Sequence, residues 1–270
     1  MASDWIVVEA KVFGCVAELS VNEIPVGRVG HEQARAMVVP VNQYLVKGAN
    51  ALGLIVNPGP TPAEATTPAK EPVRSGGATA TVSLVRYAAG AVTGDGSGDV
   101  LATIAWAGRA DNEPEQFPQS VTAEAKVAMP LGPWNWQSAE VLELNDETTE
   151  RVANLVEAIR SGLHAGDARP FFELGARSLQ EIARAFGDSP DQGVTILRAV
   201  VDHSRNAAHW KFPPIPRDLW DLRLVAGGRM IECVGKDWDP LVRSITDEEA
   251  NSFSMPMFVG RTAGRWAVLR

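Results

Sequence analysis

With 270 residues, the chain is long enough for two ordinary domains, and its 45% hydrophobic and 21% charged residues are typical of a globular protein. The net charge of −8 argues against a partner held through its phosphate backbone, so no nucleic-acid partner is predicted. No apolar run approaches the roughly 18 residues of a membrane span, and the N-terminus does not resemble a signal peptide, so no membrane partner is predicted.

The N-terminal half is predicted to be a β-sandwich domain over residues 1–137, because its apolar residues alternate in short runs separated by turn residues. The expected strands are Trp5–Phe13, Cys15–Val21, Met37–Val41, Ala51–Val56, Ala78–Tyr87, Val100–Ala107 and Val121–Met129. Residues 57–77 hold five prolines and are predicted to form a long surface loop or linker.

The apolar period changes after about residue 145, where buried-type residues recur every three or four positions, as on one face of a helix. Asn145 or Asp146 is expected to cap the first helix, with acidic residues in its first turn. Three helical segments are predicted around residues 152–163, 171–186 and 194–201.

Beyond the proline run at residues 213–216 the period returns to two, which predicts an antiparallel meander. Its expected strands are Leu219–Val225, Arg229–Val234, Pro240–Ser244, Phe253–Val259 and Arg265–Leu269. The predicted fold class is therefore two-domain: an all-β sandwich over 1–137, followed by an α+β domain over 145–270 with helices packed on a curved antiparallel sheet.

Two segments of the first domain, Glu18–Gly27 and Gly48–Leu52, resemble the galactose-binding-like jelly roll. That family often carries a V-N-G-x-x-V-G hairpin and a later G-x-N-x-L. Glu23 stands where the family pattern has glycine, which puts the geometry of the hairpin turn in question. The resemblance implies a β-sandwich that is scaffold in many members, and it does not imply a carbohydrate ligand.

The second domain resembles the NTF2-like or cystatin-like α+β cone, carried by Leu163–Ala168, the following helix and Gly264–Arg270. This resemblance implies a ligand pocket or a dimer face. Enzymes of the ketosteroid isomerase type in this family use a carboxylate base and a tyrosine donor. The only tyrosines, Tyr44 and Tyr87, fall in the first domain, so that catalytic pattern is missing; His209 or Trp210 would be substitute donors.

The densest polar group of the second domain comprises Asp202, His203, Arg205, His209 and Trp210. One interpretation places these residues at the mouth of the cone as ligand-binding residues, with a histidine as acid or base. The favoured alternative is a helix C-terminus, where cations are stabilised by the dipole, followed by an ordinary loop. Histidines six residues apart on a helix do not share a face, which argues against a metal site there.

Other candidate sites have simpler interpretations. Asp95, Ser97 and Asp99 could supply oxygens to Ca²⁺, but a glycine-rich hairpin loop is favoured. Cys15 and Cys233 fall in different predicted domains and are interpreted as small core residues of a protein in a reducing, cytoplasmic compartment. The eight tryptophans are scattered, which favours core anchors over a sugar-stacking surface.

Because no complete catalytic constellation is present, the predicted function is a non-catalytic module that binds a small molecule or a protein, without cofactor or metal. One alternative is an enzyme that acts on a small apolar ligand in the cone pocket, and another is a carbohydrate-binding module. A homodimer through the C-terminal sheet is a further prediction.

Overall fold

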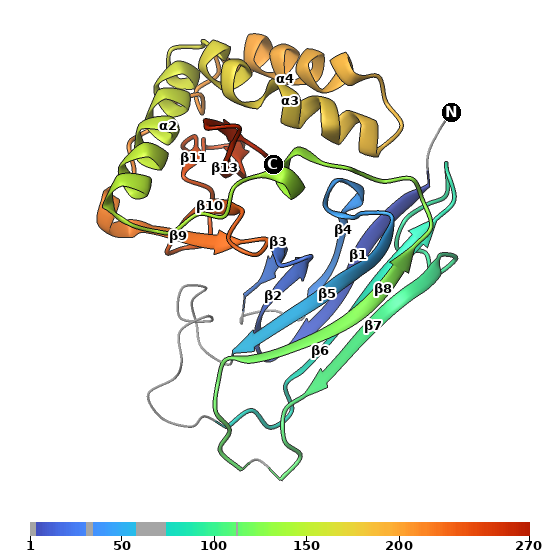
Figure 1. The fold of residues 1–270 in the computed structure, drawn as a ribbon. Coiled ribbons are helices and arrows are strands. Elements are labelled where there is room, and N and C mark those ends of the chain that lie inside the picture. Colours follow the sequence, from blue (N-terminus) through green and yellow to red (C-terminus); the bar gives the residue numbers. More distant parts are fainter. Residues whose placement is uncertain (1–3, 31–34, 58–73, 112) are drawn as a thin grey trace. The chain divides into compact units, whose positions relative to one another are not determined.

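The computed structural model describes residues 4–30, 35–57, 74–111 and 113–270. The chain divides into two compact units, Met1–Pro133 with Ala185–Gly187, and Trp134–Arg184 with Asp188–Arg270. Over the described residues it forms four antiparallel sheets and three α-helices, an α+β fold that is mostly β (Figure 1). The predicted proline-rich loop at 57–77 lies largely outside the described residues, since 58–73 are not among them.

The first unit contains two four-stranded antiparallel sheets, in the orders β4-β1-β6-β7 and β3-β2-β5-β8. Their strands are β1 Trp5–Phe13, β2 Val16–Val21, β3 Ile24–Val29, β4 Arg35–Pro40, β5 Gly48–Asn57, β6 Thr79–Tyr87, β7 Asp99–Ala107 and β8 Gln119–Val127. A short 3-10 helix, η1, spans Asn42–Tyr44. The two sheets contact each other along β7 and β8, and each buries an alternating row of apolar side chains.

The strand β3 was not predicted, and its sequence explains why. Ile24–Val29 contains Pro25 and Gly27, two residues that are depleted in strands. Among the described strands, β3 is an edge strand that pairs with β2 alone. Proline is tolerated at an edge because one side of the strand has no neighbour that needs its N–H.

The turn between β2 and β3 keeps the geometry of a tight hairpin although it has no glycine. Asn22 and Glu23 both have positive φ, 52° and 63°, as a type I′ turn requires. The side chain of Asn22 donates to the backbone oxygen of Tyr44 at 2.8 Å and to Oδ1 of Asn50 at 2.9 Å. The two asparagines of the jelly-roll-like segments therefore join this hairpin to the start of β5.

Replacing Glu23 with glycine is expected to raise the free energy of unfolding by about 0.5 kcal/mol, because relief of left-handed strain exceeds the added entropy of the unfolded chain. Urea denaturation of the purified variant measures this change. Glu113, also exposed, has no positive φ, so Glu113→Gly should lower stability instead. Equal losses in both variants would show that Glu23 is not strained.

The second unit combines three helices with an antiparallel sheet of order β14-β13-β10-β9 and a two-stranded sheet, β11-β12. The helices are α2 Asp146–His164, α3 Arg169–Ala185 and α4 Pro190–Ser204, with 3-10 helices η2 Asn135–Ser138 and η3 Arg217–Leu219. The strands are β9 Trp220–Val225, β10 Met230–Gly235, β11 Val242–Arg243, β12 Ser254–Met255, β13 Phe258–Thr262 and β14 Arg265–Val268. In Figure 1, α3 and α4 run side by side after α2.

Helix α2 begins as predicted. The side chain of Asn145 accepts a hydrogen bond from the backbone N–H of Thr148, and Asp146 and Glu147 occupy the first turn. The helix ends just before Gly166, whose φ of 72° is easily reached only by glycine. Close approach also requires glycine at position 193 of α4, where an added Cβ would lie 2.8 Å from the backbone oxygen of Leu179 in α3.

Helix α2 and the sheet of the second unit share one core. Its buried residues include Val152, Ile159 and Leu163 from α2, and Ile231 and Val259 from the sheet. Leu155 and Trp266, which bracket the space predicted to be a cone, also belong to this cluster or pack against it. Side chains therefore occupy much of the space between α2 and the sheet, and a ligand site must be sought at its margin.

No helix among the described residues is long and apolar enough to cross a lipid bilayer.

Candidate functional site

Three of the predicted site residues lie on the surface at the C-terminal end of α4. Asp202 and His203 belong to the last turn, and Arg205 follows it; all three are exposed. Arg205 and Asp202 form an ion pair of 3.8 Å, a distance too long for a hydrogen bond. Such exposed pairs contribute little to stability, so this group has the character of an ordinary helix end.

His209 bonds to an acidic loop at residues 247–251. Its Nδ1 lies 3.1 Å from Oδ2 of Asp247. Burial alone would raise the pKa of Asp247, but hydrogen bonds from the backbone and side chain of Asn251, together with the one to His209, bring it below its usual value. The Asp247 carboxylate thus orients the His209 imidazole and also accepts the hydrogen bonds that close the turn at residues 247–251.

Trp210 is a core residue. Its side chain is 3% exposed, and its indole N–H donates to the backbone oxygen of Leu163 at 2.7 Å. The ring contacts Phe212 and Phe253 at centroid distances of 5.0 and 5.1 Å. Because both its face and its N–H are used internally, Trp210 offers no surface to a ligand.

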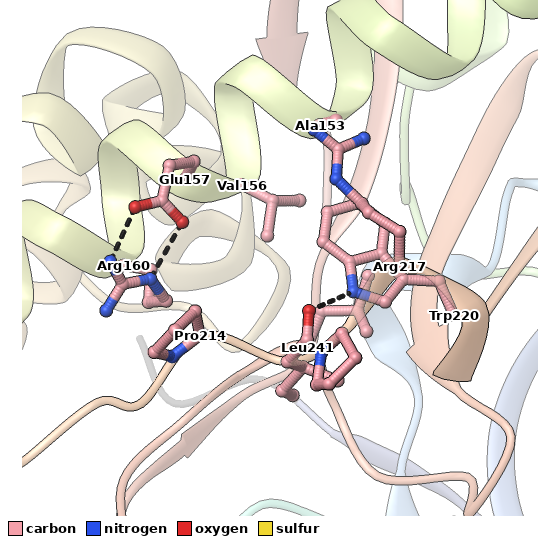
Figure 2. Close-up of a pocket in the computed structure, with 10 residues that line it drawn as sticks. Ala153, Val156, Glu157, Arg160, Pro214, Arg217, Trp220 and Leu241 are labelled. Carbon is pink, nitrogen blue, oxygen red and sulfur yellow. Dashed lines mark hydrogen bonds and ion pairs between the residues drawn. The ribbon is translucent and has the colours of Figure 1, made fainter.

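A pocket of about 380 Å³ lies at the margin of the same core, within the second unit. Its lining comes from α2, from the segment that leads into η3, from the start of β9 and from the chain before β11 (Figure 2). The lining residues are Ala153, Val156, Glu157, Arg160, Pro214, Ile215, Pro216, Arg217, Trp220 and Leu241. A mainly apolar pocket of this size with a few polar groups fits a small-molecule site.

One side of the pocket carries an ion pair that is internally complete. Nε and Nη2 of Arg160 donate to the two carboxylate oxygens of Glu157 at 2.8 and 2.5 Å. Figure 2 shows this pair to one side of Val156. The hydrogen bonds from Arg160 lower the pKa of Glu157 to about 2, so the carboxylate is ionised and a weak base at neutral pH.

The other side carries a cation whose charge is less completely neutralised. The Arg217 guanidinium lies over the Trp220 ring, 4.6 Å from its centroid, and 3.8 Å from the Glu150 carboxylate. Within the part of the chain that the structure describes, Arg217 donates no side-chain hydrogen bond. The indole N–H of Trp220 is satisfied by the backbone oxygen of Ile215 at 2.9 Å.

The proline-rich wall of the pocket is fastened to α2. Arg160 donates a short hydrogen bond through Nη1 to the backbone oxygen of Phe212. The backbone N–H of Phe212 donates to Nδ1 of His164 at 3.1 Å. The backbone oxygen and N–H of Phe212 are thus bonded to two side chains one turn apart on α2. The wall is therefore positioned before any ligand binds.

A second hollow of about 380 Å³ lies in the first unit, beside the turn after β2, the start of β5 and the middle of β8. Its amide side chains, Asn22 and Asn50, already bond to one another and to backbone groups. These amides therefore hold the hairpin together, and the hollow has fewer polar groups to offer a ligand.

The cysteines and the glycine-rich acidic loop show structural contacts. Burial raises the pKa of Cys15 to about 11 and that of Cys233 as well, which disfavours the thiolate at neutral pH. Asp95 accepts from the backbone and hydroxyl of Ser97 at 2.8 and 2.6 Å, while Asp99 accepts from Arg86. No group of three or more His, Cys, Asp or Glu in the described ranges is arranged to hold a metal ion.

The sequence interpretation missed the pocket. None of the five predicted site residues lines it. Glu157 and Arg160 fall in the first predicted helical segment but were not singled out, and residues 213–216 were noted only as the proline run before the meander. A usable signal was present in Ile215 and Trp220 close to Arg217, because ligand pockets combine apolar side chains with a few charged ones.

Comparison with known protein families, with curated proteins and with solved structures finds no match to this chain. The function must therefore be argued from the geometry of the site.

Proposed function

We propose that the protein is a non-catalytic binding module whose second unit takes a small, mainly apolar ligand in the pocket between α2 and residues 214–217. The observation that carries this proposal is the pocket itself: seven of its ten lining residues are apolar, and the wall that follows Phe212 is fastened to α2. Burial of apolar ligand surface supplies the affinity, at roughly 25 cal/mol per Å² removed from water.

The polar groups of the pocket suit binding better than proton transfer. Arginine stays protonated in proteins, so Arg160 and Arg217 can position a ligand but cannot act as acid or base at neutral pH. Glu157, with its pKa near 2, takes up a proton poorly. This chemistry supports the binding interpretation over the alternative of an enzyme acting in the same pocket.

We further propose that the first unit is a galactose-binding-like jelly-roll sandwich and the second an NTF2-like cone, in a two-domain protein. The bonded pair Asn22 and Asn50 in the jelly-roll-like segments supports the first assignment. Three helices followed by an antiparallel meander support the second. Binding of carbohydrate by the first unit and a homodimer through the C-terminal sheet stay as predictions.

Filling the pocket is expected to abolish binding of a neutral apolar probe. Ile215 lines the pocket and is only partly buried, so Ile215→Trp adds an indole to the cavity without opening the core. Titration with N-phenyl-1-naphthylamine, followed by the emission of the directly excited probe, should show saturable binding to the unaltered protein. The variant should bind at least about tenfold more weakly, since the apolar contact area is lost.

The control is Ile196→Trp, which adds the same side chain at an exposed position of α4 outside the pocket. Its affinity for the probe should equal that of the unaltered protein. Equal binding by both variants, or no saturable binding to the unaltered protein, would refute the proposed site.

A further inference from the structure

We infer that the ligand of this pocket carries an anionic group, a carboxylate on a compact apolar body, and that Arg217 binds that group. The inference rests on the proposed function, because it assigns the chemistry of the ligand at the same site.

The lining contains one carboxylate and two guanidinium groups. Glu157 and Arg160 neutralise each other through two hydrogen bonds, and Arg160 is further fixed to the backbone oxygen of Phe212. Arg160 side-chain exposure is only 13%, so this guanidinium is both satisfied and shielded. The net charge offered to a ligand is therefore the positive charge of Arg217.

Arg217 is placed to receive an anion. Its guanidinium is 51% exposed, lies over the Trp220 ring at the edge of the pocket, forms an ion pair with Glu150 at 3.8 Å, and also helps to lower the pKa of Glu157 through space. Contact with the aromatic face leaves the N–H edge of the planar group available for a bidentate pair with a carboxylate. Figure 2 shows Arg217 and Trp220 on the side of Val156 opposite the Glu157–Arg160 pair.

The apolar lining and Arg217 together define the occupant. A ligand whose hydrocarbon body contacts Val156, Pro214 and Leu241 can direct one terminal carboxylate to Arg217 at the rim. A cationic head group would meet a positive rim instead. Glu150 competes with the ligand for the same guanidinium, because it is the carboxylate now paired with Arg217.

The experiment compares octanoate, 1-octanol and octylammonium, which share a chain and differ in charge, as competitors of bound N-phenyl-1-naphthylamine at pH 7.5. Octanoate should bind about tenfold more tightly than octanol, because a charge-assisted hydrogen bond is the added interaction, and octylammonium should bind most weakly. In Arg217→Gln the affinities for octanoate and octanol should agree within about twofold, with octanol unchanged.

Two further variants distinguish a specific contact with Arg217 from a general effect of the protein's net charge. Glu150→Gln removes the competing carboxylate and should tighten octanoate binding by about threefold while leaving octanol unaffected. Arg265→Gln removes an exposed arginine from β14 and changes the net charge by the same amount as Arg217→Gln. It should alter the affinity for neither octanoate nor octanol.

The outcomes distinguish the two proposals. Equal affinity for all three competitors, or a preference for octanoate that persists in Arg217→Gln, would overturn the anion inference and leave the apolar site standing. A probe that binds in the pocket but is not displaced by octanoate would overturn the anion inference too. A probe that binds equally well to Ile215→Trp would overturn the proposed function itself.

Discussion

Replacing Phe212 with alanine should lower the free energy of unfolding of the second unit by about 4 kcal/mol, the largest effect expected for any single change considered. The side chain is fully buried and packs edge-on against two other rings, with centroids 5.0 Å from Trp210 and 5.9 Å from Phe253. Truncation removes both the burial and these ring contacts, and leaves a cavity that rigid neighbours cannot close.

The loss should also reach the pocket. Alanine keeps the backbone N–H and oxygen that fasten the proline-rich wall to α2, but the buried ring that positions this backbone is lost. Denaturant unfolding followed by tryptophan fluorescence measures the stability, and probe titration measures the pocket. Phe13→Ala is the matched control, since Phe13 is 57% exposed, and it should change stability by less than about 0.5 kcal/mol. A loss below about 1 kcal/mol for Phe212→Ala would contradict the packing described.

The second large effect is expected for Asn50→Asp, which should destabilise the first unit by about 3 kcal/mol at pH 7. Nδ2 of Asn50 donates to the backbone oxygens of Val46 and Gly48 at 2.8 and 3.1 Å, and the side chain is almost fully buried. In the variant a carboxylate oxygen replaces this donor and faces two carbonyl oxygens. Repulsion and the buried charge both oppose folding.

This destabilisation should depend on pH with a defined sign. The folded environment disfavours the charged form, so the pKa of the introduced carboxyl rises above its unfolded value. Protons are then bound more strongly in the folded state, and the loss of stability should be smaller at pH 4 than at pH 7. Unfolding midpoints at the two pH values, each relative to the unaltered protein, measure this difference.

Asn145→Asp provides the matched control for that change. Asn145 caps α2 with its oxygen and is exposed, and asparagine and aspartate serve about equally at such positions. The control should therefore differ from the unaltered protein by less than about 0.5 kcal/mol at pH 7. A similar cost for both variants would show that Asn50 is not the buried donor that the structure indicates.

Predictions from local pattern succeeded where local forces decide the structure. The strand Trp5–Phe13 was predicted with the bounds observed, and Asn145 caps α2 as expected. Each of these features depends on residues within one turn or one strand, so the period and the capping residues are sufficient to find it.

Predictions failed where the outcome depends on a distant partner. The strand β3 exists because β2 supplies its hydrogen bonds, which overrides the poor strand propensity of Pro25 and Gly27. Trp210 was placed among ligand-binding residues because of its polar neighbours, but Leu163, 47 residues earlier, accepts its N–H and draws it into the core. The residues that adjoin Trp210 in the sequence give no indication of this distant partner.

The sequence by itself determined the change from period two to period 3.6 and back, and with it the order of strands, helices and meander along the chain. Only the tertiary structure decided the site. Its walls come from α2, the segment at 214–217, β9 and Leu241, which are far apart in sequence. It also decided how far each cation is paired: Arg160 bonds to both carboxylate oxygens of Glu157 and donates to the Phe212 carbonyl, whereas Arg217 forms a longer ion pair with Glu150 at 3.8 Å. Charge neutralisation depends on distances of a few ångströms between side chains, and those distances exist only in the folded chain.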